Sequence, residues 1–299
     1  MLTLRTLMGN HPHALPIKRG EVSSPTLRLD FADEPVPHEA FKPFVRELKF
    51  DCGELAIVTF LQAIIYGKPL VLLPAVISAR FHHASLGYNA SRGALAPGDL
   101  EGRTVAVRTY AQTTGVWVRG ALARQFGVDT SRINFLTFDE AHLAEYRDPP
   151  NCRPAPAGRN LDEMLLNGEV DAGIPIALAS NLMKDARVRA VIPDPEAAAR
   201  AWHERFRAAP INHMLVARKS VLDEHPEAVR DLYKMFVAGK ARMAPQAGDI
   251  DFLPFGFEAT RPGLELVVDL ALEQGIIPRR ISFDEIYEDA RRVLGDVAR

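Results

Sequence analysis

Residues 55–77 form the most apolar stretch of this 299-residue chain. Gly67, Lys68 and Pro69 interrupt it, so neither half reaches the roughly 20 apolar residues that a membrane-spanning helix needs. The first half is typical of a buried helix that ends at Gly67, and residues 69–77 of a central strand covered on both faces. This pattern indicates an α/β fold with a largely parallel sheet.

Composition narrows the class of protein. Charged residues make up 25% of the chain and hydrophobic residues 47%, which is ordinary for a globular protein. The 36 basic side chains nearly balance 38 acidic ones, which argues against a nucleic-acid-binding protein and an acidic disordered tail. Cys52 and Cys152 are too few for a disulfide scaffold and too far apart for a CxxC motif. With no signal peptide or membrane segment visible, we expect a cytoplasmic protein that binds neither nucleic acid nor membrane.

The rest of the chain alternates apolar strands with amphipathic helices. Strands are predicted at residues 2–8, 26–31, 69–77, 104–108, 133–138, 170–176 and 190–192, with a further apolar segment at 208–218. Helices are predicted at residues 54–66, 116–126, 161–167, 226–243, 262–274 and 283–294. The strand–loop–helix pattern restarts near residue 103, which predicts two α/β lobes. Residues 1–100 and 212–299 would form one lobe and residues 101–211 the other, with crossovers near 97–103 and 205–214.

Seven short segments carry a family resemblance. They are DCGEL (51–55), RFHHAS (80–85), DLEGRTVAV (99–107), TGVWVRG (114–120), AEYRDPPN (144–151), MLLNGEVDA (164–172) and PINH (210–213). In this order they resemble the 4,5-dihydroxyphthalate decarboxylase family, a cytoplasmic branch of the type II periplasmic (solute) binding-protein fold. The resemblance implies two lobes with a ligand cleft between them.

The same resemblance implies an activity, namely decarboxylation of an aromatic acid such as 4,5-dihydroxyphthalate to 3,4-dihydroxybenzoate and CO₂. The alternative is a non-enzymatic solute-binding protein for a small carboxylate, like the binding component of an ABC transporter, because one fold hosts both. A decarboxylase needs a carboxylate anchor, a general acid for the ring carbon and a poorly solvated pocket. The last third of the chain is predicted to be mostly helical and offers a surface through which the protein could form a homo-oligomer.

Three polar residues at the start of a predicted helix are candidates for binding a carboxylate. Gln112, Thr113 and Thr114 follow the strand at 104–108 and precede the helix at 116–126. A helix N-terminus offers free N–H groups and a partial positive charge to an anion. Simple helix capping by a threonine is the alternative.

A basic segment follows the predicted central strand, at the end where open α/β sheets bind ligands. In extended chain Arg80 and His82 share one face, and His83 takes the other. Under the resemblance, Arg80 would bind a carboxylate, with His82 beside it, and His83 would donate a proton. A solvated basic edge of the sheet is the alternative.

His213 and Glu54 complete the expected catalytic set. His213 begins an apolar segment at the second crossover and is the other candidate proton donor. Under the resemblance, Glu54 would orient a substrate phenol. The alternatives are a hydrogen-bonded buried histidine and an acid that stabilises a helix dipole.

Asn10 and His13 lie in the first loop, which borders the cleft in this fold, and are expected to contact substrate; a mobile surface loop is the alternative. The nine histidines show no HExxH spacing and no accompanying CxxC. We therefore expect no required cofactor or metal; the alternative is a divalent metal held by histidines from distant segments.

Overall fold

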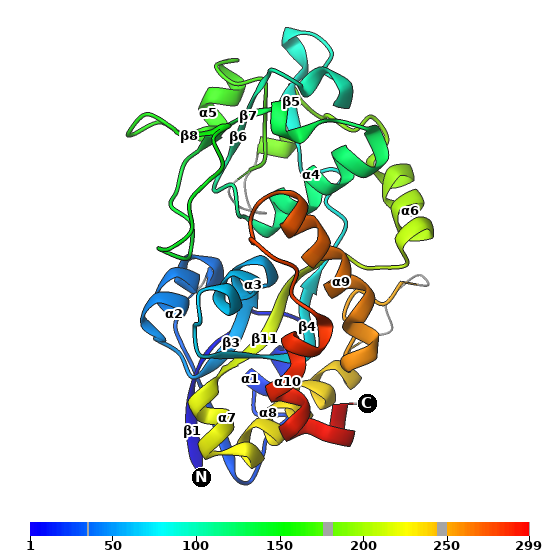
Figure 1. The fold of residues 1–299 in the computed structure, drawn as a ribbon. Coiled ribbons are helices and arrows are strands. Elements are labelled where there is room, and N and C mark those ends of the chain that lie inside the picture. Colours follow the sequence, from blue (N-terminus) through cyan, green and yellow to red (C-terminus); the bar gives the residue numbers. More distant parts are fainter. Residues whose placement is uncertain (35, 176–181, 244–249, 299) are drawn as a thin grey trace.

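The computed structural model describes residues 1–299 except 35, 176–181, 244–249 and 299. Its strands form two sheets, one in each of two lobes that lie one above the other in Figure 1. The first sheet has the order β2-β1-β3-β11-β4, with strands β1 (Leu2–Leu7), β2 (Leu27–Phe31), β3 (Cys52–Ala56), β4 (Leu70–Ala79) and β11 (Ile211–Arg218). The second has the order β10-β5-β9-β6-β7-β8, with strands β5 (Gly87–Asn89), β6 (Thr104–Val107), β7 (Asn134–Thr137), β8 (Cys152–Pro154), β9 (Ala172–Gly173) and β10 (Val188–Ala190).

Most helices surround the first sheet or connect strands of the second. Their bounds are α1 (Leu15–Lys18), α2 (Phe41–Glu47), α3 (Ile57–Ile65), α4 (Thr113–Phe126), α5 (Leu161–Leu166), α6 (Pro195–Phe206), α7 (Lys219–Glu224), α8 (Pro226–Ala241), α9 (Phe257–Glu273) and α10 (Phe283–Leu294). Short 3₁₀ turns η1 (Pro37–Ala40) and η5 (Leu182–Lys184) also matter for the site. No helix in the described part of the chain is long and apolar enough to cross a bilayer.

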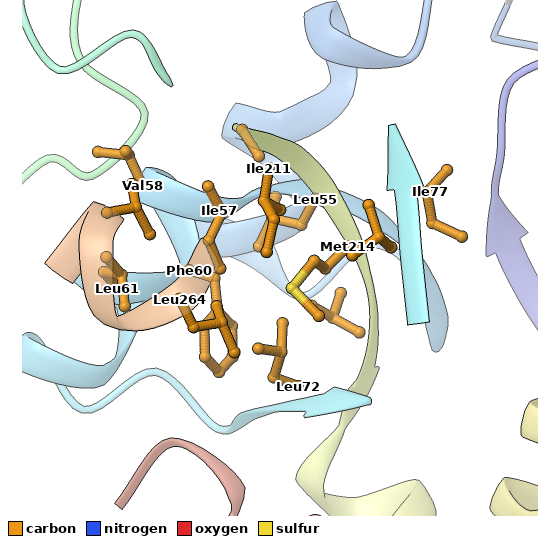
Figure 2. Packing of buried hydrophobic residues seen from close by; sticks show 14 of the residues in the cluster. Leu55, Ile57, Val58, Phe60, Leu61, Leu72, Ile77, Ile211, Met214 and Leu264 are labelled. Atoms are coloured by element: carbon orange, nitrogen blue, oxygen red, sulfur yellow. The ribbon is translucent and has the colours of Figure 1, made fainter. Parts of the chain in front are cut away.

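The core of the first lobe is continuous from strand to helix. Figure 2 shows side chains of β3, α3, β4, β11 and α9 meeting in one cluster that includes Leu55, Phe60, Leu72, Met214 and Leu264. All five are at most 1% exposed. Close packing at this density holds the strand ends, and therefore the side chains that follow them, in fixed positions.

The C-terminal helices also hold the second lobe. The Gln274 side chain, directly after α9, accepts a hydrogen bond from Arg119 Nε at 2.7 Å and donates to the Val116 carbonyl at 3.0 Å. Arg119 lies in α4 and is buried, with its guanidinium 3.9 Å from the centre of the Tyr110 ring. These contacts join α9 of the first lobe to α4 of the second.

The predicted α/β class and two-sheet organisation are observed, but several details differ. Strand β4, predicted to be central, lies at the end of the first sheet, and α9 begins at Phe257, five residues before the predicted start. Two further differences bear on the site. Glu54 was expected in a helix, whereas it lies in β3, which pairs with both β1 and β11. A short apolar run does not distinguish a buried strand from a buried helix, so the sequence placed the helix start three residues early. The chain also changes sheets between β4 and β5, ahead of the predicted crossover near 97–103, because β5 pairs with β9 and β10.

Candidate functional site

A cavity of about 390 Å³ lies where the two lobes meet. Its walls come from the ends of β4, β6 and β11, the first turns of α3 and α4, and the turns η1 and η5. The lining residues are His38, Phe41, Ala56, Thr59, Arg80, Phe81, Ala84, Ser85, Arg108, Gln112, Thr113, Thr114, His142, Ile174, Pro175, Met183, Lys184, Asn212 and His213. Because both lobes contribute, the cavity exists in this form only when the lobes are together.

Two helix N-termini converge on the cavity. Ala56 precedes α3 and Gln112 precedes α4, and neither helix has a side-chain cap. The two helix starts touch, since the Val58 N–H lies 3.4 Å from Thr113 Oγ1. The buried Oε1 of Gln112 has no hydrogen-bond partner among the residues that the structure describes. Free N–H groups and the positive ends of two helix dipoles make this wall suitable for a carboxylate.

Cationic side chains line the same cavity. Arg80, Arg108 and Lys184 all contribute to the wall, and no aspartate or glutamate among the described residues does. The Arg80 guanidinium is half-buried, has no hydrogen-bond or ion-pair partner within the described ranges, and has its pKa lowered by burial. An arginine held without a carboxylate partner indicates an anionic ligand.

Behind this wall, one buried carboxylate holds two histidines. Glu54 Oε2 lies 2.6 Å from His213 Nδ1, and Oε1 lies 2.9 Å from His11 Nε2 and 2.6 Å from the Gly9 N–H. Burial by itself would raise the pKa of Glu54, but the hydrogen bonds and charges of the two histidines outweigh it and lower the pKa, so the carboxylate is ionised. His213 lines the cavity, and its bond to Glu54 leaves Nε2 as the nitrogen available to a ligand.

The direction of the His213 side chain depends on an irregularity in strand β11. β11 pairs regularly with β3, where His213 lies opposite Ala56, but its pairing with β4 shifts register on both sides of His213. Such β-bulges redirect a side chain away from its regular direction. The Phe41 ring packs edge-on against the imidazole, with 5.1 Å between ring centres. Strand irregularity and aromatic packing together fix the imidazole.

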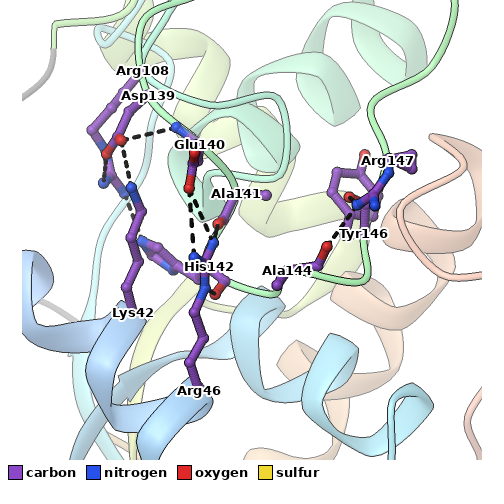
Figure 3. Close-up of polar contacts among 10 residues, drawn as sticks. All are labelled: Lys42, Arg46, Arg108, Asp139, Glu140, Ala141, His142, Ala144, Tyr146 and Arg147. Atoms are coloured by element: carbon purple, nitrogen blue, oxygen red, sulfur yellow. Dashed lines mark hydrogen bonds and ion pairs between the residues drawn. The ribbon is translucent and has the colours of Figure 1, made fainter.

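A second histidine, which the sequence did not single out, holds an arginine. His142 Nδ1 lies 2.7 Å from Thr59 Oγ1, and its Nε2 lies 3.2 Å from Arg108 NH2. Asp139 lies 3.4 Å from Arg108 NH1 (Figure 3). Thr59, Arg108 and His142 belong to three separate segments, so no motif spacing links them.

Two basic residues of α2 bind the loop that carries His142. Lys42 Nζ lies 2.5 Å from Asp139, and Arg46 donates to the carbonyls of Ala141 at 2.7 Å and His142 at 2.8 Å (Figure 3). Since α2 belongs to the first lobe and the loop follows β7 of the second, these contacts join the lobes beside the cavity.

The remaining predicted residues lie outside the cavity wall. His83 is buried, with Nε2 2.8 Å from Gln125 Oε1 and its ring against Trp202. His82 is 2% exposed, and neither ring nitrogen has a hydrogen-bond partner in the described part of the chain. His13 is fully buried behind His11. Asn10 accepts a hydrogen bond from Lys18 on the surface. Glu54 also lies behind the wall, where both oxygens are engaged by the protein.

Of the predicted set, the structure therefore brings together Arg80, Gln112, Thr113, Thr114 and His213. It adds lining residues that no motif marked, among them His38, Phe41, Thr59, Arg108, His142, Lys184 and Asn212. Among the described residues, no cluster of three or more His, Cys, Asp or Glu side chains has a geometry that would hold a metal ion.

Comparison with known proteins identifies the family. No family model matches the chain. A curated relative, 4,5-dihydroxyphthalate decarboxylase of Comamonas testosteroni, is 30% identical over 260 residues, which cover 80% of this chain and 75% of the relative. The chain belongs to the 4,5-dihydroxyphthalate decarboxylase family. The resemblance drawn from the seven segments is thereby confirmed.

Solved structures establish the fold of this family member. The alkanesulfonate-binding protein SsuA of Xanthomonas axonopodis pv. citri, bound to MOPS, has a TM-score of 0.61 at 14% identity and covers 93% of this chain and 95% of its own. The aliphatic sulphonate binding protein SsuA of Escherichia coli also has a TM-score of 0.61 at 14% identity, covering 96% and 91%. The desulfurization enzyme DSZB has a TM-score of 0.56 at 13% identity, covering 98% and 99%. The predicted periplasmic-binding-protein-like fold is confirmed, and it occurs in both binding proteins and an enzyme.

Proposed function

We propose that this protein decarboxylates an aromatic hydroxy-carboxylic acid such as 4,5-dihydroxyphthalate, forming 3,4-dihydroxybenzoate and CO₂ in the cytoplasm. The observation that carries the proposal is the pair Glu54–His213, in which a buried, ionised carboxylate holds a histidine at the wall of a cationic cavity. Membership of a decarboxylase family supports the reaction class.

The first requirement of the reaction is an anchor for the carboxylate that is retained. Arg80 and the first turn of α4, with Thr113 and Thr114, supply a guanidinium fork, hydroxyl groups and free backbone N–H groups. These groups hold charge without transferring a proton, so they orient the ring and leave its chemistry to other residues.

The second requirement is a proton for the ring carbon that bears the departing group. His213, protonated at both nitrogens, donates its Nε2 proton to that carbon, while a hydroxyl para to it supplies electron density to the ring. The bond to the carboxylate then breaks, its electron pair returns to the ring, and CO₂ leaves. One proton is consumed in each turnover, so His213 is reprotonated from water. Glu54 stabilises the imidazolium and keeps the ring in place.

The third requirement is a dry site for the leaving carboxylate. Phe41, Phe81, Ile174 and Met183 supply an apolar part of the cavity wall. A carboxylate placed against apolar side chains loses hydration, which favours the neutral product CO₂.

The test is turnover of 4,5-dihydroxyphthalate by the purified protein, followed by chromatography of substrate and 3,4-dihydroxybenzoate. His213→Asn keeps an amide N–H for Glu54 but removes the second nitrogen, and should lower kcat by at least about 100-fold. His83→Asn is the matched control, because His83 lies outside the cavity, and should retain turnover. Loss of activity in His83→Asn with retention in His213→Asn would reverse the assignment.

A second candidate function is carboxylate binding without catalysis. The converging helix N-termini and the unpartnered Arg80 suit it fully, and two of the solved structures above are solute-binding proteins. A thermal-shift panel of aromatic and aliphatic dicarboxylates separates the two, because a ligand of the folded state raises Tm. A clear shift with no turnover of any aromatic acid would favour the binding protein.

A further inference from the structure

Hydrogen-bond chemistry assigns the proton on His142. All nitrogens of an arginine side chain are donors, so the 3.2 Å contact between Arg108 NH2 and His142 Nε2 requires Nε2 to be the acceptor. The proton of the neutral ring then lies on Nδ1, which donates to Thr59 Oγ1 at 2.7 Å. The donor-only guanidinium of Arg108 thus sets the tautomer of His142, and the Thr59 hydroxyl, which can accept as well as donate, accepts the Nδ1 proton and holds the ring in place.

His142 is also unsuited to donate a proton itself. Its side chain is 7% exposed, and both ring nitrogens are already engaged. Burial, followed by the positive charges of Arg108, Lys42, His38 and His213, lowers its pKa well below the ordinary 6.5. A neutral, enclosed imidazole serves as a fixed acceptor.

Arg108 is positioned yet keeps donors free. Its side chain is 8% exposed and lines the cavity, with NH2 held by His142 and NH1 near Asp139. Its buried Nε has no partner within the described ranges. A guanidinium has five N–H donors, so several remain for a ligand in the cavity.

We propose that His142 is a positioning residue, which Thr59 holds in place through the Nδ1–H···Oγ1 bond so that the Arg108 guanidinium is fixed as a second anchor for the carboxylates of the bound acid. The identity of that acid rests on the proposed function; the positioning does not. Thr59 lies on α3 of the first lobe, whereas His142 and Arg108 belong to the second. The anchor is therefore completed only when the lobes meet, aided by Lys42 and Arg46 (Figure 3).

The test compares two substitutions of one residue. Thr59→Val keeps the shape but removes the hydroxyl, and Thr59→Ser restores it. Using phthalate as the probe in calorimetry, we expect Thr59→Val to raise Kd about tenfold, because a His142 that is no longer held cannot fix Arg108 for one charged hydrogen bond to the ligand, and Thr59→Ser to bind like the wild type. With 4,5-dihydroxyphthalate, KM should rise in Thr59→Val while kcat changes much less.

An NMR measurement tests the protonation of His142 without any ligand. In ¹⁵N-histidine-labelled protein at pH 7, with the His142 signal assigned by its absence in His142→Asn, the wild type should show a neutral ring protonated at Nδ1. In Thr59→Val the Nδ1 proton should lose its acceptor and its signal should shift, whereas Thr59→Ser should keep the wild-type signal. An Nε2–H ring or an imidazolium in the wild type would overturn the inference.

The outcomes separate this inference from the proposed function. If the wild type turns over but Thr59→Val binds phthalate unchanged, the positioning role is wrong and the decarboxylase remains. If no aromatic acid is turned over but the binding and tautomer results hold, the positioning role stands and the proposed reaction is wrong.

Discussion

Replacement of His13 by leucine should make the protein less sensitive to mild acid. His13 is fully buried, and neither ring nitrogen has a hydrogen-bond partner among the described residues. Phe236 and Phe255 pack against it. Burial, helped by the nearby charges of His11 and Lys240, lowers the pKa of His13 from the ordinary 6.5 to about 4. The folded protein therefore keeps this ring neutral at a pH where the unfolded chain protonates it.

The sign and size of the effect of His13 on the free energy of unfolding follow from proton linkage. Between pH 6.5 and about 4 the unfolded chain binds a proton that the folded protein does not, so folding stability falls as pH falls. With these two values the loss attributable to His13 is about 0.2 kcal/mol at pH 7 and about 2 kcal/mol at pH 5. The expected difference between the two pH values is thus about 1.8 kcal/mol.

The assay is urea unfolding of wild type and His13→Leu at pH 7 and pH 5, followed by tryptophan fluorescence. Other buried histidines, including His82 and His142, steepen the curves of both proteins equally, so the comparison isolates residue 13. Any packing change in the variant adds a constant that is the same at both pH values. If the stability difference between the two proteins is the same at pH 7 and pH 5, the reasoning about His13 is refuted.

Three further predictions concern packing, binding and lobe contact. Gly239→Ala should destabilise the protein by about 1–3 kcal/mol in urea unfolding, because the added Cβ would lie 2.2 Å from the backbone oxygen of His13; wild-type stability would contradict this. Arg80→Gln should weaken phthalate binding about tenfold in calorimetry, because it removes a charged donor, while unfolding changes little. Lys42→Met removes the inter-lobe contact with Asp139, and should weaken phthalate binding and flatten its dependence on salt; an unchanged salt dependence would speak against the contact.

The sequence predicted the fold class because its signals are local. Alternating strands and helices, with Gly67 and Gly127 at helix ends, follow from backbone preference and apolar period. The helix predicted at residues 283–294 has the same bounds as the observed α10. Helices α2 and α6 were not predicted, because α2 is short and the first turns of α6 contain adjacent alanines that show no helical apolar period.

The site could be predicted only where its residues lie beside a strand or helix end. Arg80 and Thr113 have such places, and the structure lines the cavity with both. The link between Glu54 and His213 spans 159 positions, and that between Thr59 and His142 spans 83. Such pairs are created by strand pairing and lobe contact, and a single sequence contains no signal for them. His82 and His83 were correctly predicted to lie near a strand end, but the sequence does not show which way the chain bends there. Both side chains are buried outside the cavity wall.

The shifted register around His213 changes how other sequences of this family should be compared. A histidine aligned with His213 is necessary for the proposed chemistry, but its direction is set by how β11 pairs with β4. In a relative that keeps the histidine but pairs these two strands regularly, we expect the histidine to point away from the substrate. Such a relative would bind the acid without protonating its aromatic ring. We therefore expect enzymes and non-catalytic binding proteins within this family to differ in the register of the strands beside the cavity. A sequence alignment does not show this difference.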